Sequence, residues 1–299
     1  MAGDHAIYHD GWILSSKVMR VPWDNSGTAD KHPENWPWEL YDLSKDWTQY
    51  NDVAAQYPEK VKELEKMFWE EAEQNQVLPM DSTTFTRSLL PRPNLSAGRT
   101  EFTYAGEVTG TPNGNAPNVL ASSYNIKAEV DIPEGGAEGM LVTHGGRFTG
   151  YGFYLLKGKP VYTWNLLGLK LVKWEGQDVV SPGKHTLEFD FKYDGLGAAT
   201  LKYGSPSGLG RSGTGYLKVD GKVVATQKME KTVPMLMQWC ESFDVGADTG
   251  SPVADGDYQT PFRFNGKIDK LTLTIDRPKL SPGDIEKLKA AMHANPASE

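Results

Sequence analysis

Four acidic residues near the end of the chain could bind a cation. Asp244, Asp248, Asp255 and Asp257 lie in a loop-like stretch rich in Gly, Ser and Pro. A calcium ion takes several oxygen ligands, and an acidic loop can supply them. The spacing matches no EF-hand, and a solvated turn explains the same residues. Both interpretations, a calcium site and a solvated loop, stay open at this point.

An aromatic-rich segment with an arginine beside it is the second candidate site. The segment contains Tyr151, Tyr154, Tyr162, Trp164 and Trp174, and Arg147 precedes it. Flat rings suit the faces of sugars, so Arg147, Tyr151, Trp164 and Trp174 are the residues expected to bind a ligand. Aromatic residues are also common inside sheets, and packing in the core is the alternative.

The sequence predicts no catalytic residue. A reactive thiolate needs a nearby cation or a helix N-terminus, whereas Cys240 has the apolar Trp239 and the acidic Glu241 as neighbours, so a buried structural cysteine is expected. His5 and His9 are four residues apart but flank a predicted turn, which argues against zinc. The glycine-rich residues 143–152 are expected to serve turns and close strand packing.

Period-two alternation from about residue 100 to residue 277 predicts the elements that position these side chains. Tyr124, Ile126, Ala128, Val130 and Ile132 alternate with polar residues, as do Leu187, Phe189 and Phe191. This pattern is typical of strands with one buried and one wet face. Turn dipeptides separate strand-like runs at Lys157-Gly158, Asp220-Gly221 and Asn265-Gly266. The chain is therefore predicted to be mainly β, with an antiparallel β-sandwich of the jelly-roll or lectin-like type.

Smaller elements flank the predicted sandwich. Residues 1–80 are expected to form a small α+β segment, with a hairpin turning at Asp10-Gly11 and an amphipathic helix that begins at Pro58. Residues 81–99 are expected to be a linker, because Pro91-Arg92-Pro93 favours extended backbone. The sandwich then occupies residues 100–277. Residues 278–299 are a helical tail, with a helix over Pro282–Met292.

Composition argues against several classes of partner. The 299 residues carry a net charge of -8, which disfavours binding to nucleic acid or to an anionic membrane surface. No apolar run is long enough to span a membrane. With one cysteine, an internal disulfide is impossible. The first residues show no signal peptide, so a cytoplasmic location is expected if Met1 is the natural start.

Several segments, in order and with short gaps, resemble the C-terminal region of bacterial arylsulfatases of the sulfatase family. They are AIYHDGW (6–12), WELYDLSKD (38–46), NDVA (51–54), PEKVKEL (58–64), FWEEA (68–72), VLPMD (77–81), GRTEFTY (98–104) and FDVGADTG (243–250). In this resemblance, residues 1–80 are a remnant of the small C-terminal α+β subdomain of a sulfatase. The catalytic α/β domain that normally precedes it is missing.

The resemblance implies a sulfuric ester hydrolase whose catalytic residues lie outside this chain. Sulfatases use a formylglycine made in a (C/S)-x-(P/A)-x-R motif together with calcium, and the sequence around Cys240 lacks that motif. No cofactor is therefore expected in this chain, and calcium is expected only in the missing domain. The expected partner is that missing or separate catalytic domain, with a glycan or sulfate ester as possible ligand. An exposed patch around Trp12, Trp23 and Trp36 would mark the missing contact.

The alternative hypothesis is a free-standing, lectin-like carbohydrate-binding module. It would bind sulfated or plain glycans through the segment from Arg147 to Trp174.

Overall fold

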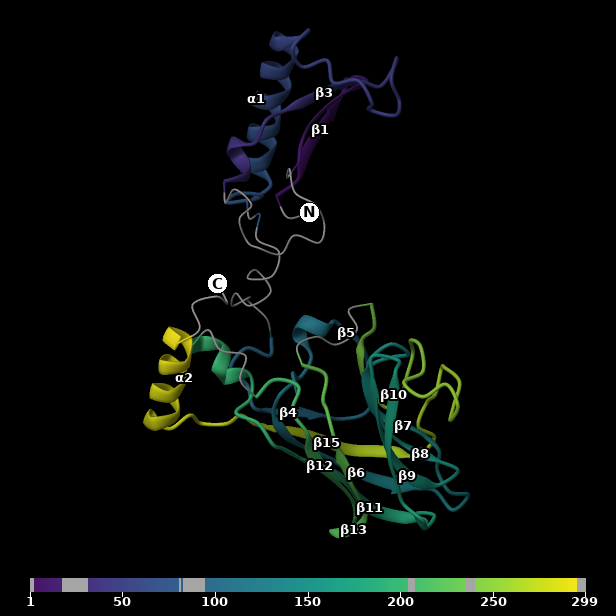
Figure 1. Cartoon of the computed structure of the whole chain (residues 1–299). Helices are drawn as coiled ribbons and strands as arrows, with labels where there is room; N and C mark the ends of the chain where they lie inside the picture. Colours follow the sequence, from purple (N-terminus) through teal and green to yellow (C-terminus); the bar gives the residue numbers. More distant parts are fainter. Residues whose placement is uncertain are drawn as a thin grey trace. The chain divides into compact units, whose positions relative to one another are not determined.

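The computed structural model describes residues 3–17, 32–80, 82, 95–203, 208–234 and 240–294 (Figure 1). The chain divides into two compact units, Met1–Arg92 and Pro93–Ser298. Each unit is described by itself below. Most of the predicted linker, residues 81 and 83–94, lies outside the described residues.

The N-terminal unit is a three-stranded antiparallel sheet with one helix. The strands β1 (His5–His9), β2 (Trp12–Ser16) and β3 (Glu39–Asp42) lie in the order β1-β2-β3, and the helix α1 spans Pro58–Gln74. Asp10 and Gly11 have φ of 47° and 80°, so both central residues of the first turn are left-handed. The predicted hairpin and helix are therefore confirmed.

This unit has a small core of its own. Leu14, Leu40 and Leu64 are buried together, and the Trp38 ring packs edge-on against Phe68. Trp36 is only 8% exposed, which contradicts the expected exposed patch, because the indoles pack within the unit. Trp12 packs against the ring of Tyr57, whereas Trp23 lies outside the described residues.

The C-terminal unit is an antiparallel sandwich of two six-stranded sheets, in agreement with the predicted fold class. We call the sheet ordered β13-β12-β11-β6-β15-β4 the wet sheet and the sheet ordered β10-β9-β8-β7-β14-β5 the covered sheet. The wet sheet contains β4 (Glu101–Tyr104), β6 (Ser123–Ile132), β11 (Gly183–Tyr193), β12 (Gly213–Val219), β13 (Lys222–Met229) and β15 (Lys267–Asp276). The covered sheet contains β5 (Val108–Thr111), β7 (Gly139–Gly145), β8 (Gly150–Leu156), β9 (Lys159–Leu166), β10 (Lys170–Glu175) and β14 (Phe243–Val245).

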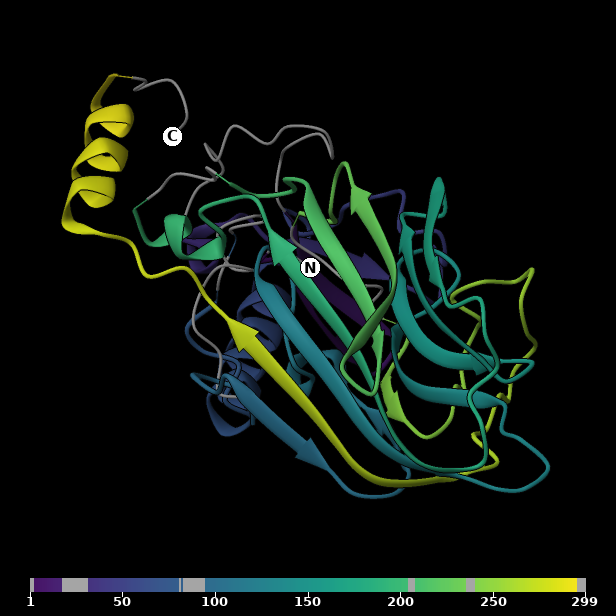
Figure 2. The ribbon, with the colours of Figure 1, turned by 90° about the horizontal axis from the view of Figure 1, so that it is seen from below.

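Strands that are distant in sequence lie side by side in both sheets. Strand β15, near the end of the unit, pairs with β6 on one side and with β4 on the other. Figure 2 shows it as the yellow arrow between two blue-teal strands. In the covered sheet, β14 likewise pairs with both β7 and β5.

The wet sheet has one buried and one solvated face, as the alternation predicts. Ile126, Leu187 and Leu271 face the core between the sheets, whereas the outer face carries polar and charged residues. On that face the Lys218 ammonium lies 2.7 Å from the Glu188 carboxylate, and Asn125 donates a 2.8 Å bond to the same carboxylate.

The covered sheet is buried on both faces. Tyr151 and Phe153 of β8 face the core, while Tyr154 packs on the opposite face against Ala254 and Tyr258. Those last two residues belong to a segment, residues 246–264, that we call the strap. Backbone bonds fix the strap to the sheet, including Gly246 N to Leu141 O at 2.9 Å. Because both faces are buried, β7 and β8 show no alternation of polar and apolar residues.

Two of the three turns predicted inside the sandwich are confirmed. Lys157-Gly158 and Asp220-Gly221 have φ near +50° and +80° and connect neighbouring strands. The prediction that Asn265-Gly266 forms a turn between two strands is wrong. The segment before these residues is the strap, which is not a strand, and only β15 follows them. The Asn265 side chain instead accepts a 2.8 Å bond from Glu138 N, just before β7.

The sandwich is followed by the predicted helix. It is α2, which spans Pro282–Ala294. Among the described residues, no helix has the length and apolar character needed to cross a membrane.

Candidate functional site

The aromatic residues predicted to bind a ligand lie in the core. Tyr151, Trp164 and Trp174 are 0–2% exposed, because β8, β9 and β10 turn these side chains toward the wet sheet. The Trp174 indole donates bonds to Gly215 O at 3.0 Å and to Gln227 O at 3.1 Å, across to strands of the wet sheet. The alternative of core packing therefore holds for these three rings, and they offer no surface to a sugar.

Two of the four candidate calcium ligands are buried and bonded to protein donors. Asp244 accepts bonds from Ser242 Oγ at 2.7 Å and from Gly110 N at 2.8 Å. Asp248 accepts a 2.6 Å bond from the hydroxyl of Tyr258. Burial raises the pKa of Asp248 to about 6, because the charged carboxylate loses its hydration.

The other two acidic residues form ion pairs. Asp255 pairs with Arg147 through two bonds, and Asp257 accepts bonds from Lys173 and from the Tyr154 hydroxyl. Within the described part of the chain, no group of three or more His, Cys, Asp or Glu side chains could hold a metal ion. In this arrangement all four carboxylates fix the strap and its surroundings.

Arg147 is the one predicted ligand residue that the structure places at the surface. It lies in the short loop between β7 and β8. Gly145 and Gly150 form the last residue pair of the two strands before this loop. A Cβ on Gly150 would lie 2.4 Å from His144 O, and a Cβ on Gly146 would lie 2.4 Å from Ser251 Oγ. The glycines thus serve close strand packing, as predicted, and let the strap approach the loop.

An exposed aromatic ring sits at the tip of the same loop. Phe148 is 65% exposed, next to the Arg147–Asp255 pair, whose side chains are 54% and 49% exposed. The two bonds of the pair measure 2.7 Å from Arg147 Nε and 2.9 Å from Nη2. Arg147 N also donates a 3.0 Å bond to Ser251 Oγ. We call Arg147, Phe148, Ser251 and Asp255 the platform.

Asn165, a buried residue of β9, holds the platform in place. Its amide nitrogen donates to Arg147 O at 2.7 Å and to Val253 O at 3.0 Å. Its carbonyl oxygen accepts a 2.9 Å bond from Gly168 N in the β9–β10 turn. One side chain therefore joins the β7–β8 loop, the strap and the β9–β10 turn. The backbone carbonyl and N–H groups that Asn165 binds belong to loops, so they have no hydrogen-bond partner within a helix or a sheet.

Sequence reasoning missed Asn165, Phe148 and Ser251. A signal for two of them existed: Phe148 is an apolar residue enclosed by glycines in a predicted turn, and Asn165 comes three residues before a glycine. Asn and Gly are residue types that favour turns. Ser251 contacts Arg147 across 104 positions of sequence, and no local pattern indicates that approach.

The cysteine and three of the histidines lie elsewhere. Cys240 is exposed, so the prediction of a buried cysteine is wrong; it lies in a turn and not in a strand. His144 is buried in β7 with Nε2 3.0 Å from Asn113 Oδ1, and burial lowers its pKa to about 4. His185 lies in β11 with Nδ1 2.7 Å from Asp220 Oδ2. The His5 Nδ1 atom lies 2.7 Å from Gly3 O in the N-terminal unit.

No protein-family model matches the chain, and no curated protein matches its sequence. Several solved structures match the sandwich. The Ruminococcus gnavus IT-sialidase CBM40 is 16% identical, with a TM-score of 0.37, over 64% of this chain and 97% of that one. The mouse laminin alpha1 LG4-5 domains are 11% identical, with a TM-score of 0.34, over 61% and 40%. The botulinum neurotoxin serotype D binding domain is 11% identical, with a TM-score of 0.32, over 64% and 43%.

These matches correct the resemblance to sulfatases. The structures named above are lectin-like and carbohydrate-binding β-sandwich domains, not the C-terminal regions of sulfatases. The identification of the chain as the C-terminal region of an arylsulfatase is therefore wrong. The assignment of residues 1–80 to a sulfatase subdomain, and of a sulfatase domain as partner, has no support among these matches. Short strings such as WELYDL are not sufficient to establish a family. The C-terminal unit is a mainly β, antiparallel sandwich.

Proposed function

We propose that this protein is a carbohydrate-binding module that holds its ligand on the platform. The observation that supports this most directly is the exposed Phe148 ring beside the Arg147–Asp255 pair. A sugar has an apolar face of C–H groups and an edge of hydroxyl groups. An aromatic face, which is electron-rich, suits the first, and an exposed pair of charged side chains suits the second.

The Arg147–Asp255 pair offers both kinds of hydrogen-bonding group. The guanidinium carries five N–H donors, and its Nε and Nη2 atoms engage Asp255. The remaining donors and the outer lone pairs of the carboxylate are therefore available to hydroxyl groups of a ligand. Because the pair is bidentate, its geometry is fixed before a ligand arrives.

The loops that carry the platform are also held in place beforehand. Asn165 bonds to three loop segments, and Ser251 binds both Arg147 N and the Glu241 carboxylate. A site ordered in advance loses less conformational entropy on binding, which matters for a small polar ligand with few strong contacts.

The proposal is tested by glycan binding of the full chain and of platform variants. A glycan array provides the first screen, and calorimetric titration then measures the affinity. Suitable first probes are the α2,3 and α2,6 sialyllactoses, which are bound in two R. gnavus CBM40 structures. Lactose serves as the probe without sialic acid. Phe148→Ala should weaken binding about 5- to 10-fold, the size of one aromatic contact. Arg147→Ala should weaken it by a similar factor, because a charged donor is lost.

A matched control removes an exposed ring elsewhere. Tyr50 is 86% exposed in the N-terminal unit, so Tyr50→Ala should leave the affinity unchanged. Binding that is indifferent to Phe148→Ala and Arg147→Ala, or an array without any bound glycan, would contradict the proposal.

A further inference from the structure

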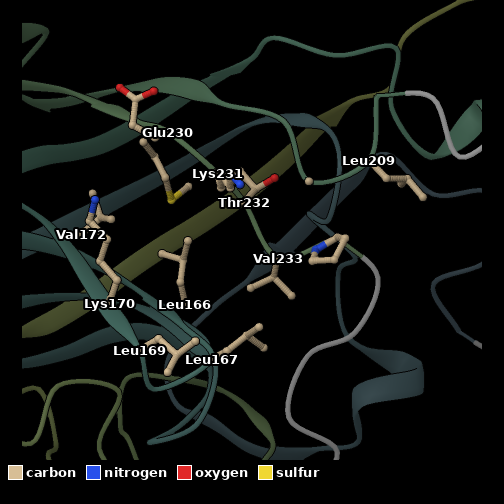
Figure 3. Close-up of a pocket in the computed structure, with 13 residues that line it drawn as sticks. Leu166, Leu167, Leu169, Lys170, Val172, Leu209, Glu230, Lys231, Thr232 and Val233 are labelled. Carbon is tan, nitrogen blue, oxygen red and sulfur yellow. The ribbon is translucent and has the colours of Figure 1, made fainter. Parts of the chain in front are cut away.

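A second candidate site lies on the other side of the β9–β10 turn. It is a pocket of about 570 Å³ between that turn and the chain that follows β13 (Figure 3). Val172, Met229 and Val233 line it and are almost fully buried, so they form an apolar floor. In Figure 3, Leu166 from β9 and Val233 lie on facing sides of the same space. Ligand pockets commonly have volumes of about 300–1,000 Å³ and mainly apolar walls.

Leucines surround the mouth of this pocket. Leu167 and Leu169 line it and are 55% and 88% exposed. Leu167 has a φ of 56°, a left-handed conformation that branched and bulky residues rarely adopt. Asn or Gly would suit this turn position better, yet the chain places a large apolar side chain there at the pocket's edge. Strained residues of this kind concentrate at binding sites.

Two cations complete the mouth. Lys170 and Lys231 line the pocket and are exposed. The Glu230 carboxylate, also at the pocket, lies 3.9 Å from the ammonium of Lys228. In the described ranges no carboxylate lies within ion-pair distance of Lys170 or Lys231. The pocket therefore combines an apolar floor with two lysines that have no acidic partner there, in a chain whose net charge is -8.

We propose that this pocket binds the monomer of a single-chain carboxylate amphiphile, such as a medium-chain fatty acid. The alkyl chain occupies the floor at Val172, Met229 and Val233. The carboxylate lies at the mouth, where the two lysines attract it. This proposal uses none of the platform side chains and is independent of carbohydrate binding.

Calorimetric titration of the full chain with octanoate, decanoate and dodecanoate tests the floor. All three are used below their micelle concentrations. The dissociation constant should fall about fourfold for each methylene added, because each buries a similar apolar area. Undecyltrimethylammonium, with the same alkyl chain as dodecanoate and the opposite charge, should bind at least about tenfold more weakly. Affinity that does not depend on chain length, or equal affinity for both head groups, would overturn the proposal.

Three charge variants test the mouth. Lys170→Glu and Lys231→Glu should each weaken dodecanoate binding about tenfold. Lys184→Glu is the matched control, since Lys184 does not line the pocket and lies 3.9 Å from Asp269, which does not line it either, and it should change the affinity less than twofold. All three side chains are exposed, so their replacement should leave the fold intact.

Leu169→Asn provides a test that is independent of charge. This exposed leucine can be replaced without disturbing the core, and dodecanoate binding should weaken several-fold. Two other occupants of the pocket would give different experimental results. A concentration-dependent dimer that Leu169→Asn abolishes would assign the pocket to a second copy of the chain. Binding to phosphatidylserine vesicles without binding of dodecanoate monomers would assign it to a membrane surface. Either result would overturn the proposal.

Discussion

The buried amide of Asn165 donates a 2.7 Å hydrogen bond to the backbone carbonyl of Arg147, 18 positions earlier in the chain. The same side chain binds Val253 O and Gly168 N, so it connects three loops at one end of the sandwich. The platform and the edge of the apolar pocket both depend on this residue, because the turn that Gly168 belongs to also carries Leu167.

Replacing Asn165 by Asp should destabilise the sandwich by about 2–4 kcal/mol. The carboxylate has the same shape, but it has no N–H groups for Arg147 O and Val253 O. It also places a charge against two carbonyl oxygens in a buried site. Urea unfolding monitored by tryptophan fluorescence measures the change. An Asn165→Asp protein as stable as the wild type would show that the amide does not organise the loops.

Gly150→Ala should cost more stability than Gly183→Ala. Both glycines have positive φ, 155° and 114°, but only at Gly150 would a Cβ meet backbone, at 2.4 Å from His144 O. At Gly183 no atom lies within 4 Å of the added carbon. We expect losses of about 3 kcal/mol or more at Gly150 and about 1 kcal/mol at Gly183, measured by urea unfolding. Equal losses would mean that backbone conformation alone requires these glycines.

Two buried groups should affect the pH dependence of stability in opposite directions. Burial lowers the pKa of His144 from 6.5 to about 4, so its contribution is present above pH 6.5 and is lost as the pH falls toward 4. Burial raises the pKa of Asp248 from 3.8 to about 6, so its contribution is present below pH 3.8 and is lost as the pH rises through 6. Each contribution is at most about 3 kcal/mol.

Single variants should separate the two contributions. In His144→Gln, stability between pH 4 and 6 should rise less steeply with pH than in the wild type, since the opposing contribution of Asp248 remains. In Asp248→Asn, stability should rise more steeply with pH over the same interval than in the wild type, since the contribution of His144 is no longer opposed. The free energy of unfolding, measured by urea titration at several pH values, distinguishes these slopes. Parallel profiles for both variants and the wild type would rule out a role of these two groups in the pH dependence.

Leu167→Asn should stabilise the protein while it weakens amphiphile binding. Leu167 has a φ of 56°, and Asn tolerates the left-handed region much better than a bulky apolar residue. The expected gain is about 0.5–1 kcal/mol, seen as a higher midpoint of thermal unfolding. Loss of both stability and binding would show instead that the Leu167 side chain is part of the core.

The sequence was most informative where one face of a sheet meets water. Strands β6 and β11 alternate strictly, so the alternation alone is enough to assign Ile126 and Phe189 to the core. Turn dipeptides such as Asp220-Gly221 then located the hairpins, because few residues adopt left-handed angles easily. These two signals were sufficient for the fold class.

The covered sheet could not be predicted in the same way. The strap buries the outer face of β8, so Tyr151 and Tyr154 are both buried although they point to opposite sides. Alternation disappears under these conditions, and surface rings could not be distinguished from core rings. The contacts of Asn165 and Ser251 join positions that are far apart along the chain, and no local pattern carries that information.

The place of β15 in the wet sheet has a consequence for synthesis of the protein. Strand β15 (Lys267–Asp276) lies between β4 and β6, both of which leave the ribosome more than a hundred residues earlier. Until β15 emerges, β6 has an open edge and β4 lacks the neighbour to which it bonds. A nascent chain of this topology exposes unpaired strand edges, which are prone to aggregation, for most of its translation. Ribosome-bound chains that end before residue 267 should therefore be far more sensitive to protease, and more dependent on chaperones, than chains released after residue 276.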